Sequence, residues 1–123
     1  MIEGLPSFLC WVDDIEIYGE NQRLSPGRGR IVLNDGYRMF KEELVIHFKA
    51  HKQRETINGS FKAWVGFWTR KDIQNCQKAI LDALEISGVV SNDRNCVSLK
   101  LDLMGRPRKK GQEKFVVMVE SLE

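Results

Sequence analysis

DIQNCQKAILDALEISG, residues 72–88, has the pattern of an amphipathic helix that begins near Asp72 and ends at Gly88. Apolar side chains recur at the three- and four-residue spacing of one helix face, at Ile73, Cys76, Ile80, Ala83 and Leu84. A second side, at similar spacing, is polar and consists of Asn75, Lys78 and Asp82. We therefore predict a helix with one face in a core and a polar seam beside it.

The polar residues of this segment each have an ordinary structural explanation. Thr69 and Asp72 fit a capping box, and the helix dipole favours an acid in a first turn. Lys78 and Asp82 have the spacing of a surface ion pair, and residues 91–93 have turn composition. Taken singly, each residue is explained at least as well by structure as by chemistry.

Strand-like and helix-like segments alternate along the rest of the chain. Ser60–Trp68 and Cys96–Leu103 alternate in polarity and are predicted strands. Lys114–Val119 follows the second of them across a basic turn, so we expect these two to form a hairpin. Further strands are expected at Ser7–Tyr18 and Ile31–Leu33.

A second helix is predicted at about Asp35–His51, because apolar residues recur on one face at Tyr37, Phe40, Leu44 and Phe48. Residues 44–50 also contain strand formers, and Asn58–Gly59 is a hairpin signal, so a helix that gives way early to a strand is the alternative. Residues 20–29 are rich in turn formers and are expected to be a loop.

These elements favour a small two-layer α+β domain, a mixed sheet with two main helices on one face. A chain of 123 residues with 42% hydrophobic content suits a single domain over residues 1–123. The net charge of +2 is too small to attract nucleic acid by itself, so any such binding depends on local clusters of basic residues.

Several ordered motifs in the chain resemble the RusA family of Holliday-junction resolvases. The matching residues are Asp72-Ile-Gln74-Asn75-Cys-Gln-Lys78, then Asp82-Ala83-Leu84, Gly88 and Asn92-Asp93. The likeness is tight from Arg70 to about Val97. Upstream it is looser, at Asn21-Gln-Arg23, Gly27-Arg28-Gly29-Arg30 and Asp35-Gly36-Tyr37.

The resemblance implies a RusA-like fold and a metal-dependent endonuclease that acts as a homodimer and makes paired nicks in four-way junction DNA during recombination or repair. It implies Asp72 and Asp93 as ligands of Mg²⁺, with Mn²⁺ as the alternative metal. Lys78 would stabilise charge on the phosphate, a role that a fixed cation can fill. Asn75, Asp82 and Asn92 would be supporting residues. RusA-like proteins are often associated with phages and prophages, and the same origin is expected for this chain by analogy.

The chain departs from the family pattern at two positions. Gln74 stands where the second helix acid is expected, and Asn92 stands at the first position of the acidic pair. Gln74 would then be a neutral metal ligand, because an amide oxygen can bind Mg²⁺ but brings no negative charge. Three interpretations stay open: a weaker or Mn²⁺-preferring nuclease, a nuclease that recruits another acid such as Asp102 or Glu85, and a junction-binding module that no longer cuts.

Basic residues that are candidates for DNA contact occur in three clusters. Arg28 and Arg30 lie in a Pro/Gly-rich segment, and Arg70 and Lys71 directly precede Asp72. The third cluster lies in the turn before the last predicted strand, at Arg106, Arg108, Lys109 and Lys110. The alternative for this turn is a solvated hairpin tip without a DNA role.

Three cysteines without a C-x-x-C pair argue against a disulfide framework and favour a reducing compartment. We find neither a signal-peptide pattern nor a membrane-spanning apolar run, so a cytoplasmic protein without membrane contact is expected. A small interaction protein with no nucleic-acid role is a further alternative, and unchanged mobility of DNA at low salt would indicate it.

Overall fold

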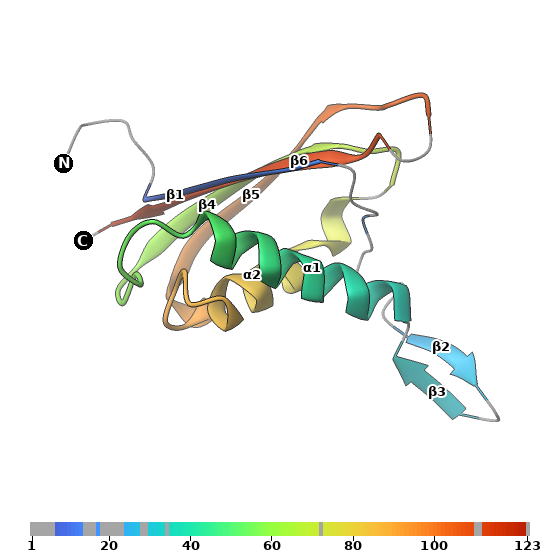
Figure 1. The fold of residues 1–123 in the computed structure, drawn as a ribbon, viewed down its shortest axis with the longest axis horizontal. Coiled ribbons are helices and arrows are strands. Elements are labelled where there is room, and N and C mark those ends of the chain that lie inside the picture. The colour runs from blue at the N-terminus through green and yellow to red at the C-terminus, as the bar shows by residue number, and fades with distance from the viewer. Residues whose placement is uncertain are drawn as a thin grey trace.

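A mixed four-stranded sheet forms one layer of the protein and two helices form the other (Figure 1). The structure is a computed structural model that describes residues 7–13, 17, 24–27, 30–33, 35–71, 73–109 and 112–122. The strands of the sheet, in spatial order, are β1 (Phe8–Asp13), β6 (Lys114–Ser121), β4 (Phe61–Trp68) and β5 (Cys96–Gly105). The predicted α+β class with a mixed sheet is confirmed.

The predicted hairpin between the last two strands is wrong. β6 pairs antiparallel with β1 on one side and with β4 on the other, and β5 pairs parallel with β4. A parallel neighbour requires a crossover connection, and α2 provides it between β4 and β5. The apolar run 115–119 fits this central position, because Phe115, Val116, Val117 and Val119 are each at most 3% exposed.

Helix α1 (Asp35–His51) has the predicted bounds, and the alternative of an early change to a strand is wrong. Its predicted inner face is buried, with Tyr37, Phe40, Leu44 and Phe48 each at most 3% exposed. Phe48 packs edge-on against Phe8 of β1 at 5.6 Å between ring centroids. Burial of these side chains holds α1 on the sheet. Figure 1 shows α1 lying along one face of the sheet.

Helix α2 (Gln77–Ile86) is shorter than the prediction, which began at Asp72. A 3₁₀ turn, η2 (Ile73–Asn75), precedes it, and the amide of Cys76 donates to the Ile73 carbonyl. The prediction of the inner face of this helix is confirmed at four positions. Cys76, Ile80, Ala83 and Leu84 are buried. After the helix the chain turns at Gly88, whose φ of 83° is the left-handed conformation that favours glycine.

Two further predictions need correction. β1 covers Phe8–Asp13 of the expected Ser7–Tyr18 strand, and the described Ile17 is buried but not in a strand. Residues 14–16 and 18 lie outside the described residues. Within the expected loop 20–29, residues Leu24–Gly27 form β2, which pairs antiparallel with β3 (Arg30–Leu33). The strand expected at Ile31–Leu33 is confirmed as part of β3.

The two faces of the main sheet differ in what covers them. Phe61, Val65 and Phe67 of β4 point towards the helices and are buried. No described helix covers the opposite face (Figure 1). Trp64 and Trp68 of β4 and Trp11 of β1 belong to this face, and the rings of Trp11 and Trp68 are in contact. We call this second side the open face of the sheet.

Candidate functional site

Asp93 lies near the last turn of α2, at the opposite end of the helix from the first turn. Asp93 opens a second 3₁₀ turn, η3 (Asp93–Asn95), and its amide donates a 2.8 Å hydrogen bond to the carboxylate of Glu85. Burial raises the pKa of the neighbouring Cys96 thiol, and the negative charge of Asp93 raises it further. Asp93 is partly exposed, and η3 leads directly into β5, which begins at Cys96.

The other predicted catalytic residues lie at the opposite end of α2. Gln74 is exposed in η2, and Lys78 is exposed in the first turn of the helix. From Lys78 to Glu85 the helix rises about 10 Å, at 1.5 Å per residue. Asp72 is outside the described residues, but its neighbours Lys71 and Ile73 belong to this same end of the molecule.

The register of the sheet also places η2 and Asp93 at opposite ends of the β4–β5 strand pair. β4 and β5 run parallel, with Phe61 opposite Cys96 and Trp68 opposite Gly105. The chain leaves β4 after Trp68 towards η2, whereas Asp93 comes just before Cys96 at the other end of the strand pair. An eight-residue strand is about 23 Å long. The expectation that the strand end, the helix start and the Asn92–Asp93 turn converge is therefore wrong within one chain.

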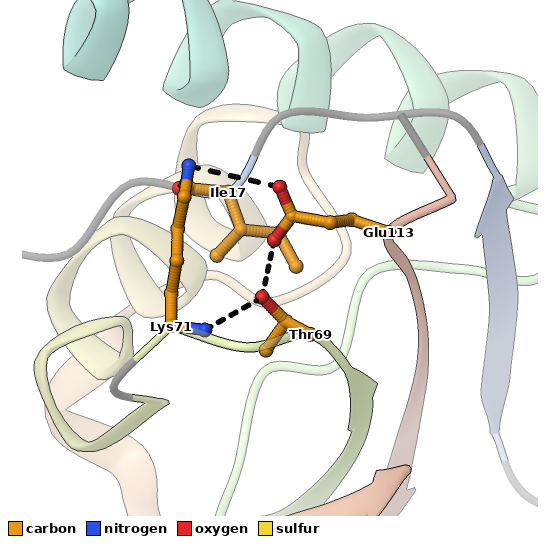
Figure 2. A network of polar contacts seen from close by, with 4 residues as sticks. All are labelled: Ile17, Thr69, Lys71 and Glu113. Carbon is orange, nitrogen blue, oxygen red and sulfur yellow. Dashed lines mark hydrogen bonds and ion pairs between the residues drawn. The ribbon is translucent and has the colours of Figure 1, made fainter. Parts of the chain in front are cut away.

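A network of polar contacts fixes the segment that leads from β4 towards η2 (Figure 2). The Thr69 hydroxyl is buried, donates to the Glu113 carboxylate and accepts a 3.1 Å bond from the amide of Lys71. The Lys71 ammonium donates to the Ile17 carbonyl at 2.6 Å and lies 3.6 Å from Glu113. Thr69 is thus engaged by Lys71 and Glu113. The expected capping box also involves Asp72, which lies outside the described residues.

Glu113 has no sequence signal that would have singled it out. It is the residue before β6, more than forty positions from Thr69 in the chain, and only the β6–β4 pairing brings the two together. Its side chain is 14% exposed, and an acid so enclosed requires charged or hydrogen-bonding partners. Lys71 supplies such a charge through its ion pair with Glu113.

A basic hollow of about 320 Å³ adjoins this network. Arg70, Arg108 and Lys109 line it together with Lys71, Pro107 and Glu113. The Arg70 side chain donates from Nε to the Pro107 carbonyl at 2.7 Å, which joins the end of β4 to the segment after β5. Two of the three predicted basic clusters therefore meet at one place.

The structure describes only some of the other residues predicted to contact DNA. Arg106 lies next to this hollow, in a second one described below. Arg30 belongs to β3, but its side chain is not among those described, and Arg28 and Lys110 are outside the described residues. The third cluster is therefore only partly assembled around the basic hollow.

Two of the supporting residues make structural contacts. Asp82 forms an ion pair of 3.4 Å with Lys41 and so joins α2 to α1. The Asn92 side chain accepts a 2.9 Å bond from the Arg94 amide and caps η3, as an asparagine at this position is well suited to do. Asn75 belongs to η2, and its side chain is not described.

The acids considered as substitutes for a charge at Gln74 lie elsewhere. Asp102 accepts a 2.6 Å hydrogen bond from the indole of Trp64 on the open face, and Glu85 is bonded to Asp93 at the far end of α2. The described residues contain no group of three His, Cys, Asp or Glu side chains that could hold a metal ion.

The basic hollow beside an exposed polar helix start offers the local positive charge that nucleic-acid binding requires. A family model described as Endodeoxyribonuclease RusA matches residues 16–120. The chain belongs to the RusA endodeoxyribonuclease family, which supports an endonuclease function like that of Holliday-junction resolvases. A comparison with curated proteins found no match. No described helix is long and apolar enough to cross a membrane.

Proposed function

We propose that this protein is a metal-dependent endodeoxyribonuclease that resolves four-way DNA junctions by paired, symmetric nicks. The observation that carries the proposal is the family match over residues 16–120, a range that contains Asp72, Lys78 and Asp93 in the family's order. The basic hollow beside η2 supports it, because a DNA backbone needs clustered positive charge. The proposed endonuclease domain is the whole of residues 1–123.

Each proposed catalytic residue has a distinct role. Asp72 and Asp93 are the carboxylates that hold the metal, preferably Mg²⁺, which favours carboxylate and water oxygens. When bound, such a metal activates a water and neutralises charge on the scissile phosphate. Lys78 is exposed on the first turn of α2, where its ammonium can approach a phosphate and stabilise the charge that develops during cleavage.

A site that uses both acids requires two chains, because Asp93 and the neighbours of Asp72 lie at opposite ends of α2. β5 is an edge strand among the described strands, and Val97 and Leu103 on it are 61% and 38% exposed. Such an edge is a template for pairing with another strand. Two β5 strands paired antiparallel about a two-fold axis place the start of each beside the end of the other.

This proposed homodimer has two composite sites, each with Asp93 from one chain and Asp72, Gln74 and Lys78 from the other. Two equivalent sites related by a two-fold axis match the approximate two-fold symmetry of a four-way junction. Paired nicks in opposite strands follow from that match. The dimer therefore accounts both for the separation of the acids and for the symmetric product.

The second candidate function is a junction-binding module with weak or no cleavage. The observation in its favour is Gln74, a neutral and exposed side chain where the family carries an acid. Loss of one negative charge lowers affinity for a divalent cation, so a higher metal concentration or Mn²⁺ would be needed for cutting. Binding through the basic hollow does not depend on that charge.

The test is incubation of purified protein with a labelled four-way junction and with a linear duplex of matched sequence. Reactions contain Mg²⁺, Mn²⁺ or a chelator, and Asp72→Asn is the control variant. We expect paired, metal-dependent nicks in the junction alone and none with Asp72→Asn, which should still bind. Junction-selective binding without cutting favours the second candidate, and absence of any DNA binding contradicts both.

A further inference from the structure

Trp11 of β1 and Trp68 of β4 form an exposed aromatic pair on the open face of the sheet. Their ring centroids are 5.6 Å apart and the rings are tilted by 32°, close to an offset stack. Trp11 is 49% exposed, an unusual environment for the largest apolar side chain, and Leu9 beside it on β1 is 43% exposed. The function proposed above does not use this pair.

The surroundings of Trp68 hold its ring flat on the sheet and add positive charge. The Lys114 ammonium lies 4.9 Å from the ring centroid, within the range of a cation–π contact. A side chain at Gly105 would bring its Cβ within 2.9 Å of Trp68 Cδ1, so only glycine lets the indole lie this close to the end of β5. Trp68 is therefore packed by Trp11 of β1, Lys114 of β6 and Gly105 of β5.

A hollow of about 550 Å³ at Trp68 continues the basic hollow beside η2. Asp13, Arg106 and Lys114 line it, and both hollows share Pro107 and Glu113. The two acids in the combined lining, Asp13 and Glu113, are outnumbered by basic residues. These are Arg70, Lys71, Arg106, Arg108, Lys109 and Lys114.

We infer that Trp11 and Trp68 form a stacking site for unpaired nucleobases of DNA. A strand whose phosphates occupy the basic hollow continues into the hollow at Trp68. Trp11 packs against Trp68 and is exposed, so an unpaired base that leaves this hollow can stack on its indole. Stacking on aromatic side chains tolerates any base and is the usual way of binding single-stranded nucleic acid. Paired bases inside a duplex do not offer a free face, so the site distinguishes opened DNA from linear duplex.

This inference rests on the proposed function only in that DNA is the ligand, and it is tested without cutting. Affinities are measured in a chelator for oligo(dT), a four-way junction and a linear duplex. We expect Trp11→Ala to weaken binding of oligo(dT) and of the junction about 5- to 10-fold, the size of one lost stacking contact, and to leave duplex binding unchanged. Trp11→Phe, which keeps a ring, should recover most of the affinity.

The matched control is Leu9→Ala, two residues away on the same strand and face, which should leave all three affinities unchanged. Tryptophan emission of the wild-type protein should also fall on addition of oligo(dT), and fall less in Trp11→Phe. An equal loss for duplex and oligo(dT), an effect of Leu9→Ala as large as that of Trp11→Ala, or a change from dimer to monomer in Trp11→Ala overturns the inference. If Trp11→Ala changes nothing while the wild-type protein binds and cuts junctions, the inference fails and the proposed function stands.

Discussion

The amide of Asp93 donates a 2.8 Å hydrogen bond to the carboxylate of Glu85, in the last turn of α2. This contact fixes Asp93 at the end of the helix that lies away from Gln74 and Lys78. Residues of one motif in the sequence are thus split between two ends of the fold. In the proposed function, a second chain completes the cleavage site that contains all of them.

Lys78→Met should reduce the turnover number for junction cleavage about 100-fold and leave the Michaelis constant nearly unchanged. The reason is that a fixed cation near the phosphate acts mainly on charge that develops in the transition state. Lys78→Arg should retain part of the activity because it keeps the charge. Lys49→Met, on an exposed position of α1, is the control, and an equal loss there would remove Lys78 from the mechanism.

Gln74→Asp should raise cleavage at limiting Mg²⁺, by about 10-fold, because a carboxylate adds a negative charge for the metal. The measurement is a titration of metal against the nicking rate of a labelled junction. The half-saturating Mg²⁺ concentration should fall in the variant. An unchanged titration would show that position 74 does not contribute to metal binding.

Glu113→Ala should destabilise the protein by about 1–2 kcal/mol, because it leaves the buried Thr69 hydroxyl without its acceptor and Lys71 without its ion pair. Urea unfolding followed by tryptophan fluorescence gives the free energy of unfolding. Glu120→Ala is the matched control on β6, since Glu120 is half exposed and forms only a surface pair with Lys62. Equal effects of the two substitutions would mean that the network is not stabilising.

Arg108→Ala combined with Lys109→Ala should weaken DNA binding and reduce the slope of log affinity against log salt by about 2, one counterion for each phosphate contact. Fluorescence anisotropy at several salt concentrations gives this slope. Lys49→Ala with Lys52→Ala, at the far end of α1, removes the same charge from another surface. A similar change in slope for that pair would show that only total charge matters.

Much of the fold could be predicted from periodicity, because α1 and the inner faces of both helices depend on local apolar spacing. Strand order could not, since the position of β6 between β1 and β4 depends on long-range pairing and on the crossover through α2. The same limit applies to the site. Lys78 and Asp93 stand out in the sequence, but their separation along α2 and the role of Glu113 become visible only in three dimensions.

The composite site is tested most directly by mixing two inactive variants, Asp72→Asn and Asp93→Asn, under conditions that let chains exchange. In a mixed dimer one site carries both substitutions, while the other has Asp72 from one chain and Asp93 from its partner intact. We predict that nicking of a labelled junction, absent in each variant alone, returns to about a quarter of the wild-type rate in a 1:1 mixture. If exchange is verified and no nicking returns, the two acids do not act together across the dimer, and the shared-site account is wrong.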